Sequence, residues 1–137
     1  MGVFIINIGT KRSAKQRTAT SSVVAARVTR EEVRAAVIAA GVGELVHVET
    51  LPQASTEDTH IVVLRVPEDS GFHSGLLRVS RALEQDCVAW MHWPYGPKGA
   101  AHAGLTGDDA DAWLPFNPQY FRLPALFDPF EPAKVTK

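Results

Sequence analysis

The chain of 137 residues contains a single cysteine, Cys87, so it cannot form an internal disulfide bond. Such cysteine usage is typical of proteins in a reducing compartment. No apolar run approaches the length of a membrane span. The apolar run 3–8 is too short for a signal peptide, and basic residues follow it rather than precede it. We therefore expect a cytoplasmic protein without a membrane contact.

The sequence also lacks an excess of charge of one sign, because 14 basic and 15 acidic residues leave a net charge of -1. No overall field attracts the chain to nucleic acid. One loop is locally basic and could contact phosphates, but it contains no aromatic residue on which a base could stack. We favour a solvated loop over a nucleic-acid contact. The basic residues concerned are Lys11, Arg12, Lys15 and Arg17.

Signatures of catalysis and metal binding are missing as well. The sequence contains no GxSxG, Walker A or GxGxxG pattern, and its histidines and single cysteine show no ligand spacing. Cys87 begins a predicted strand and has no neighbouring base, so we interpret it as a small core residue rather than a nucleophile. We expect neither a metal ion nor a cofactor.

What the sequence does contain is a clear order of elements over its first 93 residues. Apolar or alternating runs bounded by glycine and proline predict four strands, at 3–8, 45–51, 59–66 and 87–93. A basic loop is expected over 10–28. Thr29 and Glu32 form a capping box that begins a first helix, and Gly41 is placed to end it. A second helix has an apolar stripe of Phe72, Leu76, Val79 and Leu83 and a cap at Asp69 or Ser70.

This strand–helix–strand–strand–helix–strand order predicts an α+β, ferredoxin-like sandwich, with two helices on one face of a four-stranded antiparallel sheet. The expected strand order is 4-1-3-2. Residues 94–137 contain seven of the nine prolines and many aromatic residues. Such a composition excludes long helices but is too aromatic for a disordered tail. We expect domain 1–93 to carry an irregular C-terminal arm, 94–137, packed on the domain or on a partner subunit.

The sheet face opposite the helices should carry a mixed set of residues. With Ile61, Val63 and Trp90 on it, this face is too apolar to stay wet, so the arm, a second subunit or a ligand must cover it. The second and fourth strands contribute polar side chains there, and Glu49 is interpreted as ordinary polar alternation. The residues predicted to form a binding surface on this face and in the arm are His47, Arg65, Trp90, His92 and Trp113.

The first strand is similar to one of the two short motifs of RNA-recognition domains, in which an aromatic residue on the first strand stacks on a base. Phe4 would take that position. The partner motif, with glycine and two aromatic residues on the third strand, is absent from 59–66. We therefore interpret Phe4 as a core residue.

Two classes of function are compatible with these features. The first is a small, soluble, non-enzymatic binding or accessory protein, expected to be a homodimer, which acts on a protein partner through its sheet face and arm. An inhibitor or adaptor from a mobile element would have the same features. The alternative is a small dimeric ferredoxin-like enzyme or ligand-binding protein with a pocket between sheet face and arm.

Overall fold

The computed structural model describes residues 2–11, 27–52, 58–66, 72–94, 101–113 and 121–129, with side chains to 111 in the fifth range. The predicted cap of the second helix, most of the basic loop and parts of the arm lie outside these ranges. The strands are β1 (Gly2–Gly9), β2 (Glu44–Leu51), β3 (Thr59–Val66), β4 (Val88–Trp93) and β5 (His102–Thr106). The helices are α2 (Arg30–Ala40), α3 (Phe72–Ala82) and the 3-10 helix η1 (Ala110–Trp113).

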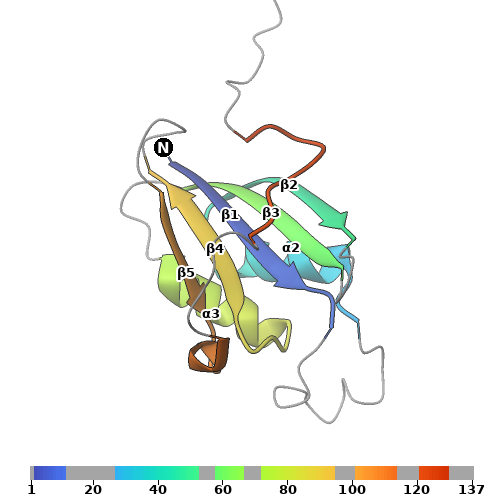
Figure 1. Cartoon of the computed structure of the whole chain (residues 1–137), viewed down its shortest axis with the longest axis vertical. Helices are drawn as coiled ribbons and strands as arrows, with labels where there is room; N and C mark the ends of the chain where they lie inside the picture. Colours follow the sequence, from blue (N-terminus) through green and yellow to red (C-terminus); the bar gives the residue numbers. More distant parts are fainter. Residues whose placement is uncertain are drawn as a thin grey trace, which may run out of the picture.

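The strands form one antiparallel sheet in the order β2-β3-β1-β4-β5, with α2 and α3 on one side of it (Figure 1). The predicted α+β class is correct, and the four predicted strands have the predicted order. The predicted number of strands is wrong, because β5 pairs with β4 and adds a fifth strand at that edge. β4 is therefore an inner strand.

The residues of β5 do not form a pattern that predicts a strand. Alanine and glycine occupy two of its five positions, and both residues are poor strand formers. Its place depends on Trp90 of β4, whose indole Nε1 donates to the Thr106 hydroxyl over 3.0 Å. A Cβ on Gly104 would lie 2.9 Å from the Trp90 ring, so glycine leaves room for the indole. The strand follows from this tertiary contact rather than from local propensity.

Helix α2 begins and ends as its sequence predicts. The Glu32 amide donates to the Thr29 hydroxyl, and the Thr29 amide donates to the Glu32 carboxylate, which completes the capping box. Gly41 ends the helix in the left-handed conformation, with φ of 64°. The buried positions Val33 and Val37 then face the sheet.

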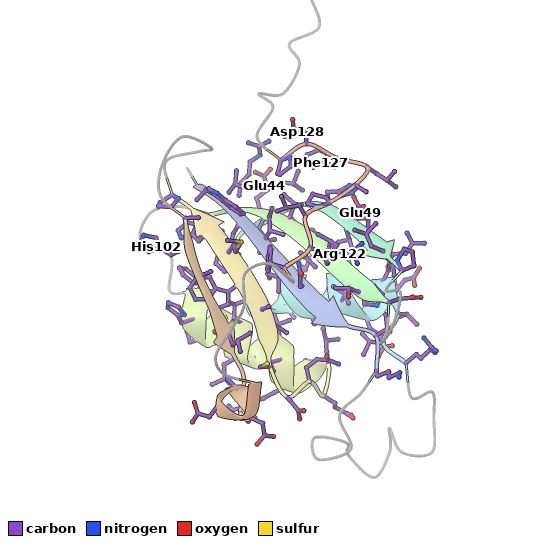
Figure 2. All side chains as sticks on the ribbon, viewed as in Figure 1. Glu44, Glu49, His102, Arg122, Phe127 and Asp128 are labelled. Atoms are coloured by element: carbon purple, nitrogen blue, oxygen red, sulfur yellow. The ribbon has the colours of Figure 1, made fainter. Side chains whose placement is uncertain are left out.

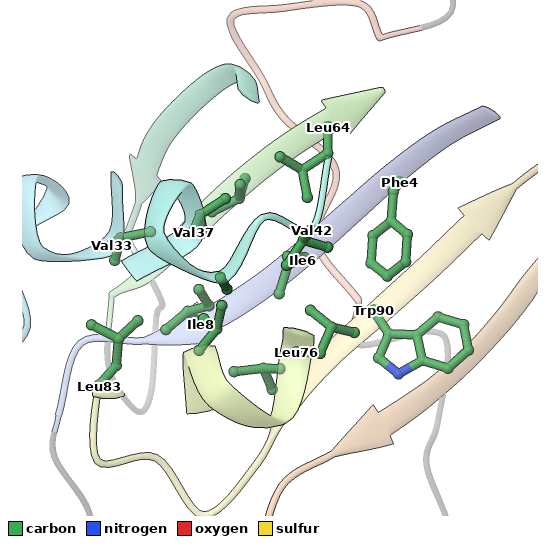
Figure 3. Packing of buried hydrophobic residues seen from close by; sticks show 14 of the residues in the cluster. Phe4, Ile6, Ile8, Val33, Val37, Val42, Leu64, Leu76, Leu83 and Trp90 are labelled. Atoms are coloured by element: carbon green, nitrogen blue, oxygen red, sulfur yellow. The ribbon is translucent and has the colours of Figure 1, made fainter. Parts of the chain in front are cut away.

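The helix face of the sheet, meaning the side covered by α2 and α3, carries the larger apolar core (Figure 3). The α3 stripe is confirmed, with Leu76, Val79 and Leu83 buried and Phe72 packed against them. Phe4 is fully buried here, with its ring centroid 4.6 Å from that of Phe72. The interpretation of Phe4 as a core residue is confirmed.

The opposite side of the sheet, which we call the arm face, differs from the prediction at β4. Phe4 and Ile6 point toward the helices, and the register places His92 opposite Phe4 and Trp90 opposite Ile6. Residues directly opposite in an antiparallel pair share a face. The assignment of Trp90 and His92 to the open face is therefore wrong.

A second departure concerns β2. The register of β2 against β3 shifts between Leu45 and His47, which is a β-bulge. The bulge lets Val46 pack against the arm-face cluster although His47 also faces that side. The bulge therefore interrupts the regular alternation of the strand, because Val46 packs on the arm face while Val48 belongs to the core on the helix face.

Within the described ranges, no helix has both the length and the apolar character needed to cross a lipid bilayer.

Candidate functional site

The arm face has a small apolar center that is covered by residues 121–129, which we call the C-terminal segment. This segment crosses the sheet on the side opposite the two helices (Figure 1). Val3, Ile5, Ile61 and Val63 form the buried center, and aromatic side chains of the segment pack against it. A segment from the end of the chain thus closes the face that the first and third strands leave apolar.

Asn7 of β1 holds the main chain of the segment at Arg122. Its side-chain amide donates to the Arg122 carbonyl over 2.8 Å, and its side-chain oxygen accepts from the Arg122 amide over 2.6 Å. The two bonds pair one side-chain amide with both main-chain groups of a single residue. Asn7 therefore binds the backbone of the segment without contacting a particular side chain through these bonds.

Glu49 of β2 binds the main chain of the segment at two further residues. Its carboxylate accepts from the Ala125 amide over 2.8 Å and from the Leu126 amide over 3.1 Å. His47 Nε2 lies 2.7 Å from the same carboxylate. Burial alone raises the pKa of Glu49, but the hydrogen bonds from Ala125, His47 and Leu126 outweigh it and lower the pKa. Glu49 is thus held as a charged acceptor although it is only 3% exposed.

Aromatic contacts complete the seating of the segment. The Phe127 ring stacks on the His47 imidazole, with centroids 4.9 Å apart and planes inclined by 16°. Phe121, six residues earlier, packs against the apolar center. Figure 2 shows Glu49, Arg122 and Phe127 gathered on this side of the sheet. Two rings thus anchor the segment on either side of its main-chain hydrogen bonds.

The two leucine side chains of the segment are exposed to solvent. Leu123 is 49% exposed and Leu126 is 81% exposed. Arg122 directs its guanidinium to the carbonyl of Pro52, over 3.2 Å from Nη1. The segment is therefore held through its backbone, its two aromatic rings and the Arg122 guanidinium, whereas its leucine side chains are exposed.

The predicted binding residues do not form one cluster. His47 and Arg65 come from β2 and β3 on the arm face, and His47 contacts the segment. Trp90 and His92 lie on the helix face instead. The backbone of Trp113 belongs to η1, but its side chain is outside the described residues. Of the five predicted residues, only His47 has a described contact with the C-terminal segment.

His92 lies in an aromatic group on the helix face. Its ring stacks on Phe4 at 5.4 Å between centroids, and its Nε2 is buried without a hydrogen-bond partner. Burial lowers the pKa of His92, and the neighbouring His102 and His73 lower it further. His92 is therefore held neutral within an apolar environment rather than poised for proton transfer.

Cys87 is the single thiol of the chain, and its surroundings disfavour the thiolate. Burial raises the pKa of Cys87 to about 11, and Asp86 and Asp109 add to the increase, so its thiol is unreactive at neutral pH. Within the described ranges, no group of three or more histidine, cysteine or acidic side chains has a geometry suited to a metal ion.

Sequence reasoning missed Asn7 and undervalued Glu49. A signal for Asn7 was present, because it is the one polar residue within the apolar run 3–8. A polar side chain in a buried strand requires a hydrogen-bond partner, and here that partner is the segment. Glu49 gave no comparable signal, since charged residues alternate with apolar ones in any half-exposed strand.

Comparison with known proteins returned no matching family model, no matching curated protein and no matching solved structure.

Proposed function

We propose that the protein is a non-enzymatic binding protein whose arm face holds an irregular polypeptide segment through its main chain. The observation that carries the proposal is the pair of hydrogen-bonding residues that bind main-chain groups of the C-terminal segment. Asn7 engages both groups of Arg122, and Glu49 engages two successive amides. Hydrogen bonds to the main chain of a ligand give affinity that does not depend on its side chains, and contacts with its side chains add specificity.

The electrostatics of the face favour the same function. A carboxylate that accepts two amide hydrogen bonds is a strong, charge-assisted acceptor. Removing the segment would leave the apolar center formed by Val3, Ile5, Ile61 and Val63 exposed to water. Exposed apolar patches rimmed by polar groups are typical of interaction sites. The face therefore gains from being occupied, by the chain's own segment or by a partner.

Two structural proposals accompany this function. The first is that β1 to β4 with α2 and α3 constitute a ferredoxin-like unit, extended by β5; the strand order supports it. Nuclear Overhauser contacts from β1 to both β3 and β4 would support it, and contacts from β1 to β2 would contradict it.

The second proposal is the homodimer expected from the sequence. The sequence predicted a dimer because the sheet has an apolar face and the arm is rich in aromatic residues. The chain's own segment covers that face, so only the aromatic arm still supports a dimer. Light scattering should give twice the 14.9 kDa chain mass. A mass near 15 kDa at tens of micromolar, roughly the concentration at which standard interfaces persist, would contradict it.

The sequence named four basic residues that could contact phosphates, Lys11, Arg12, Lys15 and Arg17. Lys11 is exposed, and the other three lie outside the described residues.

One observation favours the alternative of a small enzyme or ligand-binding protein. His47 and Glu49 form a close imidazole–carboxylate pair of the kind used in acid–base chemistry. Phe127 stacks on that imidazole, and the segment's amides engage both carboxylate oxygens. These contacts suit a pair that binds the segment better than a pair that activates a substrate.

A peptide-display experiment tests the proposed binding function. The target is the full-length Phe127→Ala variant, in which the resident segment loses its ring on His47 but the sheet face is unchanged. The matched control carries Asn7→Ala and Glu49→Gln in addition. We expect random peptides to be enriched on the first target and not on the control. Equal enrichment on both, or none on either, would contradict binding at this face.

A further inference from the structure

The C-terminal segment shows which features of a polypeptide the arm face can distinguish. Its first and seventh residues, Phe121 and Phe127, contribute the rings that pack on the face. Its second, fifth and sixth residues contribute amides that donate to Asn7 and Glu49. Its third residue, Leu123, contributes an exposed side chain. The contacts therefore fall at fixed positions along the segment.

We propose that the arm face recognises a seven-residue pattern in a polypeptide that bends at positions five and six, with aromatic residues at positions one and seven and free amides at positions two, five and six. The proposal rests on the proposed function and names its ligand class. Side chains at positions three and six do not contribute to selectivity, because Leu123 and Leu126 are exposed to solvent. Residues 121–129 are then the resident copy of the pattern.

The position of proline in the segment agrees with this pattern. Pro124 stands at position four, directly before the two amides that Glu49 accepts. Proline has no amide hydrogen, so it is tolerated only where no donor is required. The same residue at position two, five or six would remove one of the amide donors to Asn7 or Glu49. The pattern therefore excludes proline at positions two, five and six and permits it at position four.

Occupation by the chain's own segment also regulates the site. An external ligand must displace residues 121–129. Its apparent affinity is therefore the intrinsic affinity multiplied by the fraction of molecules in which the face is free. A substitution that weakens the resident segment should raise the affinity for an added peptide. A ligand that binds elsewhere would be insensitive to such a substitution.

The test uses a fluorescent, end-capped peptide with the sequence of residues 121–129 and the full-length Phe121→Ala/Phe127→Ala variant. We expect saturable binding by fluorescence anisotropy, and binding about ten-fold weaker to the wild-type chain. A peptide N-methylated at Ala125 or Leu126 should bind about ten-fold more weakly, because each lost donor leaves the carboxylate short of a bond. A peptide N-methylated at Leu123, or with Leu123→Ala, should bind within about two-fold of the parent.

The outcomes separate this inference from the proposed function. If no peptide binds to a variant whose circular dichroism matches the wild type, both the function and the pattern are overturned. If all peptides bind equally, including those methylated at Ala125 and Leu126, the pattern alone is overturned. Should the double substitution prevent folding, the same series is ranked against the wild-type chain at higher peptide concentration. A ranking that ignores the methylated positions would again overturn the pattern.

Discussion

The two faces of the sheet are built from the same strands and are covered in different ways. On the helix face, two helices lay apolar side chains such as Val37 and Leu76 onto a large, nearly all-apolar core. On the arm face, one irregular segment covers a smaller apolar center, and two polar side chains of the sheet bind its main chain. The helix face is closed by burial, whereas the arm face is closed by hydrogen bonds as well.

The difference separates a face that stabilises the fold from a face that, on our proposal, binds a partner. Ordering the nine residues of the segment costs about 1 to 2 kcal/mol each. The two aromatic rings are only partly buried, so each returns less than the value of about 4 to 6 kcal/mol expected at full burial, and each hydrogen bond adds about 1 kcal/mol. These opposing contributions are similar in size, so the segment is held by a small net free energy. A contact of that kind can exchange without unfolding the domain.

The largest effect should come from the helix face. Leu76→Ala removes a fully buried side chain and should lower the free energy of unfolding by about 2 to 5 kcal/mol, as measured by urea denaturation. Phe72→Ala, at its partly buried site in the same core, should fall within the same range. Ile38→Ala, on α2 but 63% exposed, is the matched control and should change stability by less than about 0.5 kcal/mol. Similar costs for Leu76→Ala and Ile38→Ala would break the distinction between core and surface.

On the arm face, Glu49→Gln should have an intermediate effect. The substitution places a donor group against the amides of Ala125 and Leu126, and should cost about 1 to 3 kcal/mol in urea denaturation. Glu44→Gln, on the same strand but exposed, should cost less than about 0.5 kcal/mol. Equal results for the two variants would mean that the carboxylate of Glu49 does not hold the segment.

A smaller effect is expected at Thr29, whose capping bonds serve α2 and touch neither face. Thr29→Ala should lower stability by about 1 kcal/mol through loss of the cap. Amide exchange in the C-terminal segment should remain unchanged, because the arm face keeps all its contacts. If Thr29→Ala lowered stability more than Leu76→Ala, the assignment of capping and buried positions in the two helices would be wrong.

The smallest effect concerns His92, the unpartnered polar group of the helix face. Its pKa is lowered in the folded chain by burial, then by His102 and His73, so the unfolded chain binds a proton more readily. The contribution of neutral His92 to the free energy of unfolding is therefore fully present above the ordinary histidine pKa of about 6.5. It is lost as the pH falls from there toward the lowered pKa of His92 in the folded chain. Urea midpoints at pH 7.5 and 5.5 should show this fall. The His92→Phe variant should reduce it, and an unchanged pH dependence would contradict burial of a neutral imidazole.

Much of the fold was predictable from local patterns, because those patterns have local causes. The capping box at Thr29 and the stripe containing Leu76 follow from helix geometry alone. The strand β5 was not predictable, since Gly104 belongs to a strand through its pairing with Trp90 of β4 rather than through local propensity. The face of Trp90 was also missed, because alternation gives two opposite sets of side chains but does not say which set the helices cover.

The candidate site was less predictable than the fold. The sequence indicated an apolar face and placed His47 on it, and the structure adds the contact of His47 with Phe127. It could not show that Asn7 and Glu49 converge on one segment, because their partners lie 115 and 76 residues away along the chain. Such pairing depends on the tertiary path of the arm, which no local periodicity encodes.

Amide hydrogen exchange, followed by nuclear magnetic resonance on the full-length chain, tests the central claim most directly. The claim predicts that the amides of Arg122, Ala125 and Leu126 are protected in the wild type but exchange faster than those of β1 and β3. It also predicts that Glu49→Gln abolishes the protection of Ala125 and Leu126 while the strands keep theirs. Unprotected wild-type amides in the segment, or protection lost only together with that of the strands, would contradict an arm face that binds the segment reversibly.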